Sequence, residues 1–138
     1  MIKMLKMDFV PGSVDLGLLV LRAWLGATML FNHGLKKLMD LLAGKGASFP
    51  DPIGLGPTPS LALSTFAEFV CAALLVLGLF TRFSAFVLAI QMTVAFFLVH
   101  QAALSGPQSG ELAFVYLAGF IALFLAGAGR ISFDGKAR

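Results

Sequence analysis

Long apolar runs, broken by short polar stretches, dominate the pattern along this chain. Four such runs cover about residues 14–39, 61–80, 83–104 and 111–128. Each is close to the ~20 residues that a helix needs to cross the ~30 Å hydrocarbon layer of a membrane. Because lipid offers no hydrogen bonds to open strand edges, helices are the expected solution. The pattern therefore predicts an all-α fold, an integral membrane bundle of four transmembrane helices.

The connections between these runs differ in length and composition. Only Thr81 and Arg82 separate the second run from the third, so these two helices must form a tight antiparallel hairpin. The outward connection at 40–60 is much longer and is rich in glycine and proline, which favour turns over helix. We expect a stiff, irregular loop there. Its glycines and prolines are Gly44, Gly46, Pro50, Pro52, Gly54, Gly56, Pro57 and Pro59.

These boundaries divide the chain into an N-terminal segment at 1–13, a membrane domain at 14–129 and a C-terminal tail at 130–138. In the N-terminal segment apolar residues alternate with Lys3 and Lys6, which suits either a segment lying on the membrane surface or a disordered start. The apolar run that follows is too long for the core of a secretory signal. We expect the segment to stay attached.

Composition supports the membrane class and excludes several others. The 138 residues are 59% hydrophobic and 12% charged, with a mean hydropathy of +0.93, which is too apolar for an ordinary soluble domain. The net charge is +3, but the basic residues are scattered among helix ends, so we expect no nucleic-acid partner. With Cys71 as the one cysteine, neither an intramolecular disulfide nor a CxxC redox pair can form.

The distribution of lysine and arginine predicts the orientation in the membrane. With four spans, both termini and the turn at Arg82 share one side, which carries more basic residues than the other. The positive-inside rule puts that side in the cytoplasm, and we expect a bacterial-type inner membrane. The basic residues on that side are Lys3, Lys6, Arg82, Arg130, Lys136 and Arg138, and those on the other side are Lys36, Lys37 and Lys45.

Ionisable residues inside the apolar runs are the candidates for function. On insertion scales each costs at least ~2.5–3.5 kcal/mol at the centre of a bilayer, so each needs a partner, water or a ligand. Glu111, at the start of the fourth run, joins them, although a first-turn acid also favours the helix dipole without any ligand. The five within the runs are Arg22, His33, Lys36, Glu68 and His100.

Helical geometry predicts which of these residues can meet. His33 follows Arg22 by eleven residues, which is close to three whole turns at about 100° per residue, so both share one stripe of the first helix. The same angles place Lys36 on that stripe and turn Lys37 towards the membrane interface, where it would snorkel. Arg22 lies deeper than the others. His33, Lys36, Glu68 and His100 come to a similar depth near the outer face.

The residues alone leave several roles open. Arg22 and Glu68 could form a structural ion pair that locks two helices. His33 and His100 lie on different helices, which is the minimum for bis-histidine haem ligation, but a hydrogen-bonding or relay role is commoner. No metal-binding spacing such as HExxH is present, so we expect neither haem nor a metal. Gln91 lies roughly opposite His100 on its helix, and we expect it to form a hydrogen bond between helices and not to be part of the site.

The order and spacing of these positions resemble the DoxX family of membrane proteins. The resemblance covers nearly the whole chain, from about residue 16 to residue 134. The matching positions are Arg22 and Gly26, then His33-Gly34-x-Lys36, then Glu68, then Gly78-Leu79-x2-Arg82, then His100 and Glu111, and finally Gly127-x-Gly129-Arg130-x-Ser132-x-Asp134.

The resemblance implies a four-helix bundle and a place in a redox system. The family takes its name from a membrane subunit associated with thiosulfate:quinone oxidoreductase, and other members are linked to membrane-bound redox and oxidative-stress assemblies. The chain carries no recognisable flavin, nucleotide or iron–sulfur motif. We therefore expect a subunit with a redox protein partner, not a complete enzyme; a homo-oligomer is compatible with the sequence.

The leading hypothesis is a polar intramembrane pocket that binds a quinone. His33 or His100 would donate a hydrogen bond and a proton to a quinone carbonyl, with Glu68 as the relay. Arg22 or Lys36 would stabilise the negative charge that develops on reduction. The alternatives are a non-catalytic membrane anchor or assembly subunit and, after that, a transporter of small solutes or lipids.

Overall fold

Every regular element in residues 1–7, 9 and 11–137, the residues that the computed structural model describes, is helical. Positions 8, 10 and 138 of the predicted N-terminal segment and tail lie outside these residues. Three stretches are long and apolar enough to cross a membrane, and a fourth apolar helix is shorter. The chain is therefore an all-α membrane protein, as the hydropathy pattern predicts. The stretches are Val14–Leu42, Pro57–Leu77, Thr81–Val99 and the shorter Glu111–Ala126.

The three long spans are each built from α-helix interrupted or ended by a turn of π-helix. The first joins α2 (Val14–Met29), η1 (Leu30–Gly34) and α3 (Leu35–Leu42). The second joins α4 (Pro57–Thr65), η3 (Phe66–Cys71) and α5 (Ala72–Leu77). The third joins α6 (Thr81–Val94) and η4 (Ala95–Val99), and the fourth is α7 (Glu111–Ala126). The short elements are α1 (Ile2–Leu5), the 3₁₀ turn η2 (Lys45–Ser48) and α8 (Phe133–Lys136).

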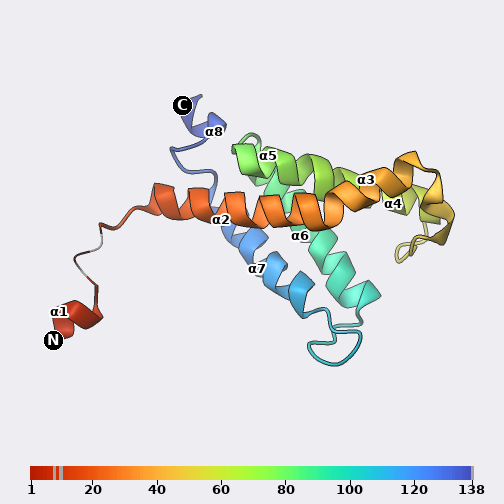
Figure 1. The fold of residues 1–138 in the computed structure, drawn as a ribbon, viewed down its shortest axis with the longest axis horizontal. Helices are drawn as coiled ribbons and strands as arrows, with labels where there is room; N and C mark the ends of the chain where they lie inside the picture. The colour runs from red at the N-terminus through yellow and green to blue at the C-terminus, as the bar shows by residue number, and fades with distance from the viewer. Residues whose placement is uncertain (8, 10, 138) are drawn as a thin grey trace.

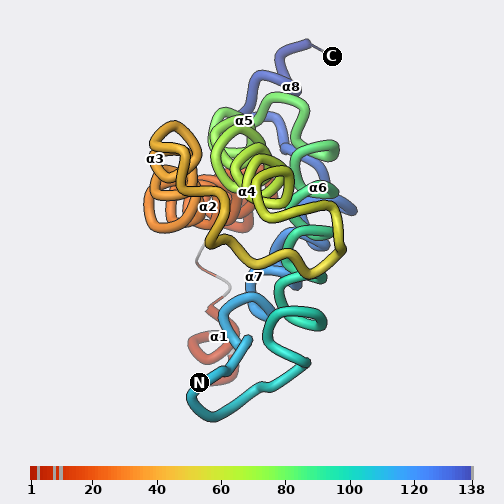
Figure 2. Tube along the Cα trace, turned by 90° about the vertical axis from the view of Figure 1, so that its right-hand side faces the viewer, coloured from red at the N-terminus to blue at the C-terminus, as the bar shows by residue number. Residues whose placement is uncertain are grey.

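The spans pack as two pairs that cross obliquely (Figure 1). In one pair the first span lies along the second, with α2 against α5, η1 against η3 and α3 against α4; in the other, α6 lies along α7. Figures 1 and 2 place the C-terminus and the α5–α6 turn at one end, which we call the terminal end. The connections that follow α3 and η4 lie away from it, at what we call the loop end. The pairs diverge towards the loop end.

Local sequence explains where the spans begin and end. The Ser13 hydroxyl accepts a hydrogen bond from the Leu16 amide at 3.2 Å and caps the start of α2. Pro57 occupies the first turn of α4, where its missing N–H costs nothing. Gly78 ends α5 with a φ of 69°, a left-handed conformation that favours glycine. These local signals therefore account for the starts of α2 and α4 and for the end of α5 without any tertiary contact.

Glycine allows the first two spans to touch backbone to backbone. A Cβ atom on Gly34 would lie 2.1 Å from the carbonyl oxygen of Glu68, and one on Gly26 would lie 3.0 Å from that of Ala72. No side chain fits at such distances, so both positions need glycine, as in other close crossings of membrane helices. The first span is thereby fixed in register against the second. The fully buried core beside this crossing includes Cys71, Leu75, Leu88, Phe120 and Leu123.

The predicted connection at Thr81 and Arg82 is displaced, because α5 ends at Leu77 and α6 begins at Thr81, so residues 78–80 form the turn. Two further predicted boundaries differ from the structure. The 40–60 connection is partly helical, because α3 continues to Leu42 and α4 starts at Pro57, with η2 between them. The third span ends at Val99 and not near residue 104, since Gln101 and Ala102 adopt φ values of 52° and 57°. Positive φ at non-glycine residues stops a right-handed helix. Apolarity alone gave no sign of either change.

Large apolar side chains on the outside of the bundle match a lipid environment. Trp24 is 72% exposed, Phe31 is 66% exposed and Leu125 is 67% exposed. A soluble monomer rarely exposes apolar residues on this scale. The outer surface is therefore suited to acyl chains.

Candidate functional site

A cavity of about 300 Å³ lies among the spans towards the loop end, and we call it the histidine cavity. All four spans contribute to its wall. Met29, Met92 and Ala113 supply apolar surface, whereas the polar lining comes from side chains that are scattered along the sequence. Those polar residues are His33, Lys37, Glu68, Gln91, His100, Ser109 and Tyr116.

The π-helical turns carry or adjoin the ionisable residues of the cavity. His33 lies in η1, Glu68 lies in η3, and His100 directly follows η4. A π-helical turn accommodates one extra residue, and such turns are frequent at functional sites. Each turn therefore changes the direction in which the residues after it point.

This change of register overturns the predicted roles of two neighbouring lysines. Lys37 forms an ion pair with Glu68, and its side chain is 22% exposed. Lys36 is 81% exposed and lies 3.8 Å from Asp40 on the surface of α3. The expectation that Lys36 faces inward and Lys37 snorkels is wrong, because η1 precedes both residues and advances the stripe by about one position.

Glu68 is the centre of a buried hydrogen-bond network. Only 3% of the residue is exposed. One carboxylate oxygen is bonded by Lys37, and the other accepts from the Gln91 amide at 3.0 Å. Gln91 also donates to the Ser64 hydroxyl at 2.9 Å. The predicted hydrogen bond of Gln91 between helices is confirmed, and it links the second and third spans. The expectation that Gln91 is not part of the site is wrong, because Gln91 lines the cavity.

His100 is held by the connection that follows it. Its Nδ1 lies 3.0 Å from the carbonyl oxygen of Gln108. Because a carbonyl only accepts, Nδ1 carries the hydrogen, and the neutral ring keeps Nε2 as the acceptor. Gly110 allows the approach, since a Cβ there would lie 2.7 Å from the His100 Cβ. The ring is thus orientated at the mouth of the cavity, with one nitrogen left for a ligand.

Tyr116 is a cavity residue that the sequence interpretation missed. Its ring meets the His33 ring edge to face, with centroids 6.3 Å apart and planes at 86°. Its hydroxyl donates to the Thr28 hydroxyl at 2.7 Å. A usable signal existed, because Tyr116 is the one tyrosine of the chain and lies in a strongly apolar helix. Buried tyrosine hydroxyls need a polar partner.

Two predicted site residues lie elsewhere. Glu111 is exposed in the first turn of α7 and does not line the cavity. Arg22 is 2% exposed and lies near the terminal end, where it donates to the carbonyls of Val76 and Ile131, to Leu75 at 3.5 Å and to Ala128 at 3.3 Å. The predicted ion pair between Arg22 and Glu68 is therefore wrong. We call Arg22 and these four carbonyls the Arg22 cluster.

The structure thus brings together His33, Glu68 and His100 of the six predicted residues and adds Lys37 and Tyr116. It does not bring Arg22, Lys36 or Glu111 to the same cavity. Among the described residues, no three His, Cys, Asp or Glu side chains approach one another as metal ligands. The arrangement can donate hydrogen bonds, hold charge and carry a proton.

Comparison with known proteins places this bundle in a family. The profile of the DoxX family matches residues 17–101. The chain belongs to the DoxX family. Two proteins of Haemophilus influenzae, both described as uncharacterized, are each 32% identical to it: one match covers 80% of this chain and 83% of the relative, and the other covers 94% and 87%. No solved structure matches.

The C-terminal part of the DoxX resemblance lies around the Arg22 cluster, outside the residues that the family profile matches. The carboxylate of Asp134 accepts hydrogen bonds from the amides of Phe80 and Thr81 at 2.9 and 2.8 Å and caps the start of α6. Ser132 is buried against Gly78, where a Cβ would lie 2.5 Å from that of Ser132. These DoxX positions therefore close the terminal end of the bundle.

Proposed function

We propose that this DoxX chain is a membrane subunit of a redox system and that its histidine cavity binds the ring of a quinone. The observation that carries the proposal is the meeting of His33, Glu68 and His100 around one cavity, the first two within apolar spans and His100 at the end of a third. A volume of about 300 Å³ is at the lower end of ligand sites. It suits a single ring with polar groups at opposite edges.

The two histidines are suited to the two carbonyls of a quinone. His33 lies in the first span and His100 directly follows the third, and both border the cavity. A carbonyl oxygen only accepts hydrogen bonds, so a ring nitrogen of His33 that carries hydrogen can hold one carbonyl, and Nε2 of His100 can hold the other when that ring is protonated at both nitrogens. Met29 and Met92 supply adaptable apolar contacts for the ring faces.

Glu68 and Lys37 complete the chemistry of reduction. A quinone becomes a quinol by taking up two electrons and two protons, and negative charge develops on its oxygens between these steps. Lys37 would stabilise that charge in place of the predicted Arg22 or Lys36, and Glu68 would pass protons to the histidines. The electrons would come from a redox protein partner.

The direct test is equilibrium binding of a chainless one-ring benzoquinone to the purified protein in nanodiscs. We expect saturable binding, with affinity about tenfold or more weaker when His33 and His100 are both replaced by alanine, since each lost hydrogen bond is worth about 1 kcal/mol. Thr93→Ala is the matched control. Thr93 is an exposed polar residue on the third span, which ends just before His100, and its hydroxyl donates to the Ala89 carbonyl of its own helix.

Two outcomes would overturn this function. One is the absence of saturable binding to the unaltered protein, and the other is equal affinity in the double histidine variant. Both results would favour the anchor or assembly role. That role has an observation in its support, since both oxygens of Glu68 already have partners within the chain.

A further inference from the structure

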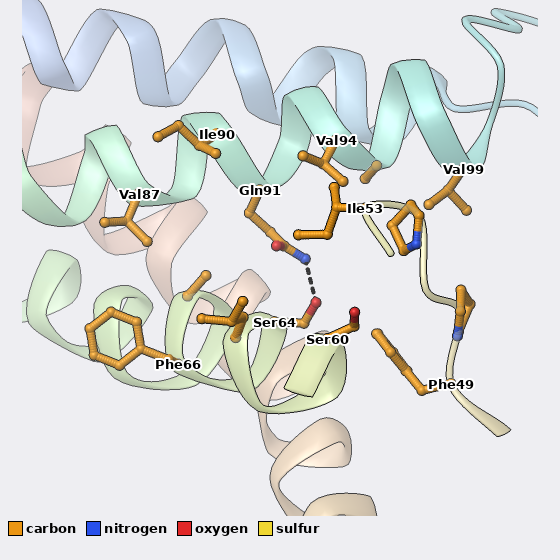
Figure 3. Close-up of a pocket in the computed structure, with 15 residues that line it drawn as sticks. Phe49, Ile53, Ser60, Ser64, Phe66, Val87, Ile90, Gln91, Val94 and Val99 are labelled. Carbon is orange, nitrogen blue, oxygen red and sulfur yellow. Dashed lines mark hydrogen bonds between the residues drawn. The ribbon is translucent and has the colours of Figure 1, made fainter. Parts of the chain in front are cut away.

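An apolar groove of about 320 Å³ lies between the second and third spans. Its walls come from α4 and η3 on one side and from α6 and η4 on the other, and the connection between η2 and α4 lies over it (Figure 3). The mechanism proposed for the histidine cavity does not use this groove. The principal apolar lining is Phe49, Ile53, Phe66, Val87, Ile90 and Val94.

The polar groups in the groove are already engaged by the protein. Ser60 donates to Asp51 at 2.8 Å, and Gln91 donates to Ser64 (Figure 3). All other lining residues are apolar. A polar ligand would find few partners here, whereas a hydrocarbon chain would find a surface that matches it.

The groove also borders the lipid. Leu63 is 52% exposed, Ile90 is 50% exposed and Phe66 is 42% exposed. These side chains lie within the predicted spans, so a chain in the groove can continue into the bilayer without crossing a polar surface. Phe49, Pro50 and Pro52 cover the loop end.

The decisive feature is that the groove and the histidine cavity share part of one wall. Gln91, Ala95 and Val99 line both. These residues follow one another at four-residue spacing and so form one stripe along the third span. Gln91 bonds Ser64, which lines the groove, and Glu68, which lines the cavity. Ala95 has the smallest side chain of the three.

We propose that the ligand of the histidine cavity is a ring that carries a long apolar chain, and that the chain lies in this groove after passing Ala95. This inference rests on the proposed function. The chain would run from Ala95 towards Val87 along about 12 Å of α6 at 1.5 Å per residue. The groove is therefore the subsite that selects a lipid-type quinone over a chainless ring.

The test compares two probes in the same nanodiscs: a chainless one-ring benzoquinone and the same ring with a ten-carbon chain. Both affinities are expressed as mole fractions in lipid, so that partitioning does not enter the comparison. Val94→Phe fills the groove and leaves the cavity lining unchanged, because Val94 lines only the groove. Val115→Phe is the matched control, since Val115 is 57% exposed on α7 and lines neither space.

We expect the unaltered protein and Val115→Phe to prefer the chain-bearing ring by about tenfold, because close contacts with the groove walls need exceed those with lipid by only about 1.4 kcal/mol. In Val94→Phe this preference should fall at least about fivefold, while affinity for the chainless ring stays the same, since the added ring takes the place of those contacts. Val87→Phe provides a second groove variant if Val94→Phe fails to give a monodisperse protein.

The outcomes separate the two proposals. If the chainless ring binds and both groove variants keep the full preference for the chain, the groove assignment is wrong while the quinone function stands. If neither probe binds the unaltered protein, the quinone function itself fails. A preference lost equally in Val115→Phe would also contradict the groove assignment.

Discussion

The two ends of the bundle treat buried charge in opposite ways. At the terminal end, three nitrogens of Arg22 donate to four backbone carbonyls, and Asp134 adds a favourable Coulomb interaction. At the loop end, Lys37 and Glu68 pair with each other beside a cavity of about 300 Å³. Arg22 is therefore surrounded by protein atoms, whereas Lys37 and Glu68 line a cavity.

This difference separates a structural use of charge from a functional one. The carbonyls of Leu75 and Val76 lie at the end of α5, where the last turn of a helix lacks its own donors. Arg22 supplies those donors and joins α5 to the tail through Ala128 and Ile131. The histidine cavity instead keeps polar groups around a space that a ligand can enter. Charged residues therefore stabilise the fold at the terminal end and line the histidine cavity at the loop end.

Removing Arg22 should have the largest effect on stability. Arg22→Ala leaves buried carbonyls without donors, and bonds to charged groups are worth about 1.5–3 kcal/mol each, so the free energy of unfolding should fall by about 5 kcal/mol. The fraction that stays folded should bind the chainless quinone with unchanged affinity. Denaturation by sodium dodecyl sulfate, followed by circular dichroism, measures the stability.

Arg82→Ala is the control for that experiment. Arg82 is exposed and donates to the Leu125 carbonyl at 3.3 Å. Its replacement should cost about 0.5 kcal/mol or less, as for other exposed charges. Equal losses for the Arg22 and Arg82 variants would break the distinction between the two ends.

The two adjacent lysines provide the next test. Lys37→Met leaves Glu68 buried without its cation and should lower the free energy of unfolding by about 3 kcal/mol. It should also weaken quinone binding by about tenfold, which corresponds to about 1.4 kcal/mol. Lys36→Met removes only a surface pair with Asp40, worth about 0.3–0.5 kcal/mol, and should leave binding unchanged. The reverse order would show that the register after η1 is not the one described.

The smallest effect is expected at Asp51, a charge outside the spans. The hydrogen bond from Ser60 is the main cause that holds the pKa of Asp51 below its ordinary value; burial opposes it, and hydrogen bonds from the amides of Gly56, Leu55 and Gly54 lower the pKa further. The stabilisation is thus fully present above about pH 4, the ordinary pKa, and is lost as pH falls through the lower folded value.

Amide hydrogen exchange at Leu55 and Gly56 measures this effect. Protection, corrected for the intrinsic rate, should decrease below about pH 4 in the unaltered protein. In Asp51→Asn the same amides should show low protection with little dependence on pH. A pH dependence that survives in Asp51→Asn would assign the titration to another group.

The architecture could be predicted because lipid allows few solutions. Apolar runs of spanning length give the number of helices and their order. The short connection between the second and third spans was also predicted, but it lies at residues 78–80, and Thr81 and Arg82 belong to α6. The helix ends were less predictable. Helix α4 begins at Pro57, inside a stretch whose many prolines indicated a loop. The third span ends just before Gln101, whose φ is positive, although the sequence stays apolar for several more residues.

The candidate site could be predicted only in part. His33, Glu68 and His100 were identified because a titratable group inside an apolar run is costly. Lys37 was misassigned, since the 3.6-residue period takes no account of the π-helical turn before it. The partners of Arg22 were missed for a different reason. They are backbone carbonyls, which every residue has, so the pattern of side chains along the sequence cannot predict them.

The most direct test of the central claim is a reduced-minus-oxidised absorption spectrum of the protein in mild detergent. The protein is first equilibrated with an excess of one-ring quinone that carries a ten-carbon chain, and free ligand is then removed. Retention of about one quinone per chain, seen as a near-ultraviolet band that disappears on reduction and is diminished in the double His33→Ala, His100→Ala variant, is the predicted result. A flat spectrum, or a band of equal size in that variant, would contradict a quinone site in the histidine cavity.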